Sequence, residues 1–289
     1  MSYEPHEHLV APARVQPDLW RLAVGAILGF AVYLMFSVAY FAVAELMIGR
    51  PWIVAAFDAT QPSQVYFLLG SFLGMLAGAI CAAILHQRGL RDLIGGYIRF
   101  ARDGLHSLVG VLPIVLVLLV FLFITEDIVW NLPPVIWVLI LPISIGFLIL
   151  QVAAEEIVFR GYLQSQLAAL NVSPVLWILI PSVLFGMAHF DTATLGQAAP
   201  WVVGWAILFG ILAADLTART GSLGAATAFH FTNNFVAMLV LGMPDHLGGL
   251  ALFHYPFSIT ASDEILTRLP QDAFAMVALY LAIRLRLKV

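Results

Sequence analysis

Long apolar stretches follow one another along most of this chain, and few folds can accommodate them. A helix that crosses a bilayer needs about 20 mainly apolar residues. We therefore expect an all-α polytopic membrane protein with about eight transmembrane helices, the first over-long and the last short. The expected spans are Leu19–Ile48, Val65–Leu85, Leu105–Ile124, Leu132–Ala153, Pro174–Phe190, Ala198–Leu216, Ser222–Leu241 and Gln271–Ile283.

The composition supports this class. Of the 289 residues, 62% are hydrophobic and only 10% are charged, whereas soluble domains carry about 25% charged residues. Such a chain cannot cover a soluble surface, so its first partner is the lipid bilayer. The net charge of −4, with no basic run, excludes a nucleic-acid partner. We expect a single membrane domain over residues 1–289, with a polar N-terminal tail over residues 1–18 and a catalytic core over about residues 150–242.

Basic residues lie mostly on one side of the expected spans, and this asymmetry orients the chain. Cytoplasmic segments are rich in Lys and Arg. With the N-terminus inside, only Arg50 and Arg268 fall outside. Both termini are therefore expected in the cytoplasm, and we expect a multi-pass protein of the inner (plasma) membrane of a prokaryote. The arginine-rich segment Gly89–Gly104 is predicted to be an interfacial helix or, alternatively, a basic loop.

Three short polar patterns interrupt the apolar sequence. A charged side chain at membrane depth costs at least ~2.5–3.5 kcal/mol, so intramembrane ionisable residues point to function. The residue types present are carboxylate, imidazole and amide, which are the parts of a hydrolytic site. The patterns are Glu155-Glu156-x-x-x-Arg160, Phe185-x-x-x-His189 and His230-x-x-x-Asn234.

The first pattern separates two adjacent carboxylates. Glu156 and Arg160 lie at i, i+4 on one helix face, so Arg160 can neutralise Glu156. Glu155 points about 100° away and is left free of that pair. An unpaired carboxylate in a dry site suits a general base. The alternative is a structural ion pair at a helix end.

The other two patterns place imidazoles and an amide on helices. Phe185 lies one turn before His189 and could wall one side of its ring; alternatively, His189 is a structural histidine. His230 and Asn234 share a helix face, and both can donate the hydrogen bonds that an oxyanion needs. The alternative for these two is an interhelical hydrogen-bond pair. Asn233 is expected to face a neighbouring helix.

Together, the three patterns resemble the motifs of the CAAX-protease and bacteriocin-processing family, also called the Abi family. The stretch Arg219-Thr-Gly-Ser-Leu before His230 is similar to the approach to the third motif, and the resemblance covers about Gln151 to Asn234. It implies a polytopic intramembrane protease, with eight transmembrane helices in some members. Its implied substrate is a peptide or protein, in some members a prenylated CAAX protein; many bacterial members have unknown substrates or are linked to bacteriocin maturation and self-immunity.

The resemblance also implies roles for the motif residues. Glu155 would activate a water together with His189, and His230 and Asn234 would form the oxyanion hole. The remaining motif residues would support the site, which would need no cofactor; they are Glu156, Arg160 and Phe185.

The expected spans raise a question of depth, because His189 falls at the opposite end of the fifth span from the level of Glu155. The site closes only if that helix tilts or stops partway, or if Asp191–Gly196 dips inward. Irregular backbone is allowed at membrane depth where it lines a wet cavity. We therefore predict a water-filled cavity, open to the cytoplasm, between spans four and seven.

Two other functions fit the same residues. Glu155, His189 and His230 could supply the three ligands of a catalytic zinc, although the compact His-Glu-x-x-His helix motif is absent. A non-enzymatic membrane scaffold, immunity protein or transporter is the other alternative.

Overall fold

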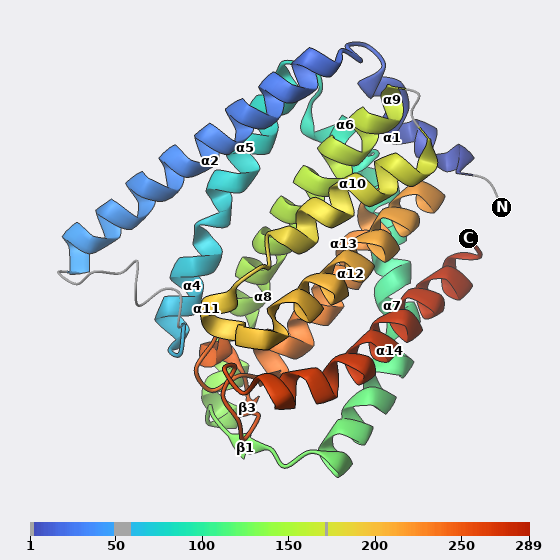
Figure 1. Ribbon diagram of the computed structural model, residues 1–289. Coiled ribbons are helices and arrows are strands. Elements are labelled where there is room, and N and C mark those ends of the chain that lie inside the picture. Colours follow the sequence, from blue (N-terminus) through green and yellow to red (C-terminus); the bar gives the residue numbers. More distant parts are fainter. Residues whose placement is uncertain (1–2, 49–58, 171–172) are drawn as a thin grey trace.

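The computed structural model describes residues 3–48, 59–170 and 173–289, which form a bundle of helices (Figure 1). The all-α class is thus confirmed. The longer helices are α2 (Leu19–Ile48), α5 (Phe72–Ile84), α7 (Tyr97–Thr125), α8 (Pro134–Glu156), α10 (Pro174–Met187), α12 (Ala199–Thr220), α13 (Gly224–Phe235) and α14 (Ser262–Leu287).

Shorter elements connect these helices. The short α-helices are α1 (Glu7–Ala13), α4 (Pro62–Gly70), α6 (Leu90–Ile94), α9 (Ser165–Ala169) and α11 (Thr192–Leu195). Two segments are π-helical, η2 (Ile157–Gln164) and η4 (Val236–Val240), and three are 3₁₀-helical, η1 (Glu4–His6), η3 (Gly196–Ala198) and η5 (Gly248–Leu250). The strands β1 (Val129–Trp130), β2 (Leu241–Gly242) and β3 (Phe253–His254) form one small sheet in the order β1-β3-β2.

Five helical segments of the described chain are long and apolar enough to cross a membrane. They are Leu19–Leu46, Pro62–Ile84, Leu90–Thr125, Pro134–Ala169 and Thr192–Thr220. The other three expected spans correspond to α10, which has 14 residues, to α13 with η4, and to the more polar α14. The protein is therefore a multi-pass membrane protein, and the count of eight spans remains a prediction.

The segment Gly89–Gly104 is mostly helical rather than a basic loop, but it is divided between two helices. It contains α6 and the start of α7, with a break at Gly95 and Gly96, whose φ angles are +78° and +91°. At Gly95 a Cβ would lie 2.3 Å from the carbonyl oxygen of Gly221, so this turn needs a glycine.

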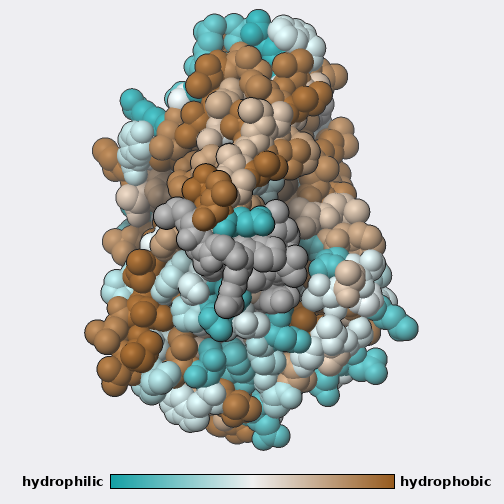
Figure 2. Space-filling model, turned by 90° about the vertical axis from the view of Figure 1, so that its left-hand side faces the viewer, coloured by the Kyte–Doolittle hydropathy of each residue, from teal (hydrophilic) through white to brown (hydrophobic). Residues whose placement is uncertain are grey.

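The interior and the surface divide as expected for a protein in lipid. Aromatic and aliphatic side chains from α7, α10, α12, α13, α14 and η2 form the largest core cluster. On α2, Ile27, Met35 and Val38 are 70%, 73% and 69% exposed. Figure 2 shows a broad hydrophobic surface on the side of the molecule that carries α2.

The N-terminal segment, expected as a polar tail, is helical and packs against the bundle. Leu9 and Ala13 of α1 are fully buried, and Val10 and Ala13 form a cluster with Ala169 of α9. The hydroxyl of Tyr3 donates to Oδ1 of Asp215 on α12 at 2.8 Å. Residues 3–13 are therefore part of the folded structure.

Candidate active site

The first motif lies where α8 passes into the π-helix η2. Glu155 and Glu156 are the last residues of α8, and Arg160 follows in η2. A π-helical turn widens the helix locally and is frequent at functional sites. Arg160 Nη1 donates to Glu156 Oε1 at 3.0 Å, and both side chains are almost fully buried. The pair expected from the i, i+4 spacing is therefore present.

Aromatic rings surround the buried guanidinium of Arg160. Its central carbon lies 4.7 Å from the ring centre of Phe185 and 5.9 Å from those of Phe159 and Phe209. Ring faces attract cations, and more strongly where water is excluded. Phe185 of the second motif thus contacts the first motif, a link between α10 and η2 that the sequence spacing does not reveal.

His230 lies between the two glutamates. Its Nδ1 is 2.8 Å from Oε1 of Glu156, and its Nε2 is 3.4 Å from Oε2 of Glu155. The imidazole is buried, and 12% of the Glu155 side chain is exposed. Glu155 is free of Arg160, as expected, but the group beside it is His230 of α13.

Asn234, one turn after His230, is held by a residue that the sequence interpretation did not assign to the site. Asn234 Nδ2 donates to Oε1 of Gln151 at 3.0 Å. Gln151 is buried on α8, one turn before Glu155. A polar residue at i, i+4 from Glu155 in an apolar helix is the signal that could have identified it. Asn233 donates to Asn234 Oδ1 at 3.1 Å rather than bonding a neighbouring helix.

His189 lies just beyond the end of α10, which stops at Met187. Its side chain is exposed, and Nδ1 is 2.8 Å from the carbonyl oxygen of Phe185. A proton on Nδ1 donated to this carbonyl leaves Nε2 as an acceptor. The ring centre of Phe185 lies 4.8 Å from that of His189 and 5.9 Å from that of His230, so Phe185 contacts both imidazoles.

The expected partnership of His189 with Glu155 is not a direct contact. No hydrogen bond or ion pair joins the two side chains among the residues that the structure describes. Nor do any three His, Cys, Asp or Glu side chains of this part of the chain gather as a possible metal site. A large cavity touches Asn233 but is lined by none of the four expected catalytic residues. The cavity open to the cytoplasm therefore remains a prediction.

Residues 134–236 match the family described as type II CAAX prenyl endopeptidase Rce1-like. This segment is similar to the Rce1-like family. It contains all three motifs, and the resemblance expected from them is confirmed. The match is to a family of proteases.

A relative extends the similarity along the chain. The uncharacterized protein YyaK of Bacillus subtilis (strain 168) is 24% identical over 254 residues, which cover 83% of this chain and 84% of YyaK. The similarity therefore includes much of the chain outside the Rce1-like segment.

Proposed function

We propose that this protein is an intramembrane endopeptidase that hydrolyses a peptide bond with a water activated by Glu155 and His189. One observation carries the proposal: the buried sequence of contacts from Glu155 through His230 and Glu156 to Arg160, within a segment that matches a protease family. Burying several ionisable side chains in an apolar protein costs free energy of folding. Their presence together therefore points to a function.

Glu155 is the proposed base. Its carboxylate removes a proton from a water molecule, and the hydroxide attacks the carbonyl carbon of the peptide bond. The C=O electron pair moves to the oxygen and forms a tetrahedral oxyanion. When the C–N bond breaks, Glu155 returns the proton to the leaving amine. In this mechanism Nε2 of His189 accepts a hydrogen bond from the same water.

His230 and Asn234 are the proposed oxyanion donors. Nδ1 of His230 lies 2.8 Å from Oε1 of Glu156, so its other ring nitrogen, Nε2, is the atom that would donate to the oxyanion. Asn234 has a second Nδ2 hydrogen besides the one given to Gln151. Donors held in place before the reaction stabilise the oxyanion without reorganisation.

The substrate belongs to the same proposal. The family description points to a peptide whose C-terminal region carries a CAAX-type sequence, with or without a lipid. A role in bacteriocin processing remains a second substrate hypothesis within the same activity. We place the protein in a prokaryotic plasma membrane with eight spans and both termini in the cytoplasm.

The test compares wild type with Glu155→Ala on a panel of fluorogenic peptides that includes prenylated C-terminal sequences. Loss of a general base should lower the rate about 10²–10⁴-fold. The matched control is Glu264→Ala, which removes an exposed glutamate on α14. Equal cleavage by wild type and Glu155→Ala would contradict the proposed base. A strong zinc chelator separates the metal alternative: activity that survives the chelator supports glutamate-activated water, and activity lost to it and restored by zinc supports the metalloprotease.

A further inference from the structure

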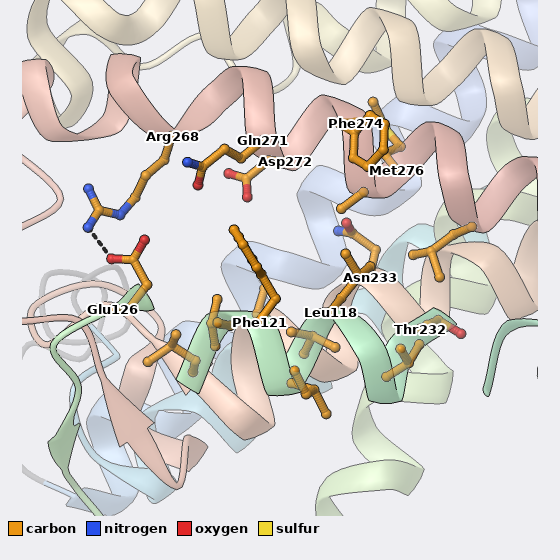
Figure 3. A pocket seen from close by; sticks show the side chains of 18 of the residues that line it. Leu118, Phe121, Glu126, Thr232, Asn233, Arg268, Gln271, Asp272, Phe274 and Met276 are labelled. Atoms are coloured by element: carbon orange, nitrogen blue, oxygen red, sulfur yellow. Dashed lines mark hydrogen bonds and ion pairs between the residues drawn. The ribbon is translucent and has the colours of Figure 1, made fainter. Parts of the chain in front are cut away.

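A cavity of about 760 Å³ lies between α7 and α14 (Figure 3). Residues of α13 and η4 form a further wall of this cavity. Helices α7 and α14 touch closely at one end, where a Cβ on Gly110 would lie 2.8 Å from that of Arg286. They separate toward the C-terminal end of α7 (Figure 1). Ligand pockets measure about 300–1,000 Å³, so the cavity is of ligand size.

Apolar side chains make up most of the lining. Leu118, Phe121 and Leu122 come from α7, and Phe274 and Met276 from α14. Phe121 and Phe274 are also 55% and 71% exposed. Because α7 belongs to a segment long and apolar enough to cross a membrane, a hydrocarbon chain in the bilayer can reach the cavity beside it.

One end of the cavity is polar and carries an excess of negative charge. Arg268 forms ion pairs with Glu126, which lines the cavity, and with Glu264 on its outer side, at 2.8 Å from the latter. The guanidinium is thus already paired with two carboxylates. Asp272 points into the cavity (Figure 3), and it forms no hydrogen bond or ion pair with any residue in the described ranges.

We propose that this cavity binds an amphiphile with a hydrocarbon tail and a positively charged head, the tail between α7 and α14 and the head at Asp272. Asp272 is accessible from the cavity and has no hydrogen-bond or ion-pair partner in the described ranges, so a cationic head can pair with it there. An anionic head would meet the carboxylates of Glu126 and Asp272, and both Nη atoms of the one guanidinium at this end are already paired. The proposal concerns binding, and it does not rest on the protease activity.

Trp205 lines the cavity and provides the readout. The full-length protein is placed in nanodiscs of neutral phosphatidylcholine. It is titrated with brominated alkyl chains of one length that carry a trimethylammonium, a hydroxyl or a sulfate head. The quenching assigned to Trp205 is the fluorescence quenching of the wild-type protein minus that of its Trp205→Phe variant. Both are measured at equal partitioning of the probe into the bilayer.

The trimethylammonium probe should reach half-maximal quenching of Trp205 at a concentration at least about tenfold below that of the sulfate probe. Asp272→Asn should remove this preference, and Asp272→Glu should keep it. The matched control is Asp263→Asn, which deletes the same charge at an exposed position of α14 outside the cavity, and it should also keep the preference.

Three results would overturn the proposal: equal affinity for the three heads, a preference unchanged by Asp272→Asn, or no quenching specific to Trp205. If Asp272→Asn fails to fold, Ala275→Leu provides the second variant. It adds volume to the apolar lining and should weaken binding of all three probes alike. Undiminished quenching in a folded Ala275→Leu protein would place the probes elsewhere and refute the site.

Discussion

Nδ1 of His230 and Oε1 of Glu156 lie 2.8 Å apart, although the two residues are 74 positions apart in the chain. The same oxygen accepts a hydrogen bond from Arg160 at 3.0 Å. Glu156 therefore fixes the orientation of the His230 imidazole on α13. Arg160 of η2 compensates the negative charge of Glu156. This shared oxygen connects the first and third motifs and aims Nε2 of His230 at Glu155.

Arg160→Met should destabilise the protein strongly. Removing one partner of a buried ion pair leaves an uncompensated charge, here on Glu156, and costs about 3–5 kcal/mol. The exposed pair of Arg14 and Glu7, with 43% and 52% of the side chains accessible, provides the control. Arg14→Met should cost only about 0–1 kcal/mol. Unfolding titrations in mixed detergent measure both, and similar losses for the two variants would contradict this account of Glu156.

Gln151→Leu should lower kcat while the protein remains folded. The substitution removes the acceptor that holds Nδ2 of Asn234, so the proposed oxyanion donor loses its orientation. We expect a smaller loss than the about 10²–10³-fold typical of deleting an oxyanion donor, with little change in KM. Asn234→Ala should show the full loss, measured on the same substrate.

Gln164→Leu is the matched control for Gln151→Leu. Gln164 is also buried, but it donates to the carbonyl oxygen of Ala214, away from the proposed oxyanion. Its substitution should reduce stability and leave kcat of the folded fraction unchanged. An equal fall in kcat for both glutamine variants would show that Gln151 acts through stability alone.

Sequence spacing predicted the side-chain contacts within a single helix. The contacts between helices depend on tertiary packing, which the spacing does not contain. The pair of Glu156 with Arg160 follows from their i, i+4 separation. The placement of His230 between two glutamates depends on how α8 and α13 pack, which no local pattern contains. α10 ends at Met187, two residues before His189, and the depth of His189 relative to Glu155 remains a prediction.

The N-terminal segment shows the same limit of sequence reasoning. Its composition suggested a polar tail, because residues 1–18 contain no long apolar run. What holds it is a set of contacts to distant residues, and these depend on the completed fold. Arg88 and His6 are the two buried groups that test this docking.

Arg88→Met should release α1 from the bundle. The buried guanidinium donates to the carbonyl oxygens of Leu9 at 3.3 Å and Gly161 at 3.2 Å, and to Gln166. Methionine would leave these acceptors buried and unpaired, at about 1–3 kcal/mol for each group that water cannot reach. Amide hydrogen exchange over residues 7–13 should become faster, whereas Arg91→Met, at an exposed position of α6, should leave it unchanged.

Docking of the N-terminal segment should weaken as the pH falls, because burial lowers the pKa of His6 from 6.5 to about 4. Glu7 opposes this shift, and Arg14 and Arg88 add to it. Nε2 of His6 has no hydrogen-bond partner within residues 3–48, 59–170 and 173–289, and the ring lies 4.6 Å from that of Trp177. The buried site therefore favours the neutral imidazole.

The undocked segment has the higher pKa and takes up its proton first. Docking is thus at full strength above the ordinary pKa of 6.5, is lost progressively as the pH falls toward about 4, and changes little below that value. Hydrogen exchange of residues 7–13 at about pH 7 and about pH 5, corrected for the intrinsic rate, measures the change. His6→Phe keeps an aromatic ring against Trp177 and cannot titrate, so its protection should be the same at both values. Equal pH dependence in wild type and His6→Phe would assign the effect to another group.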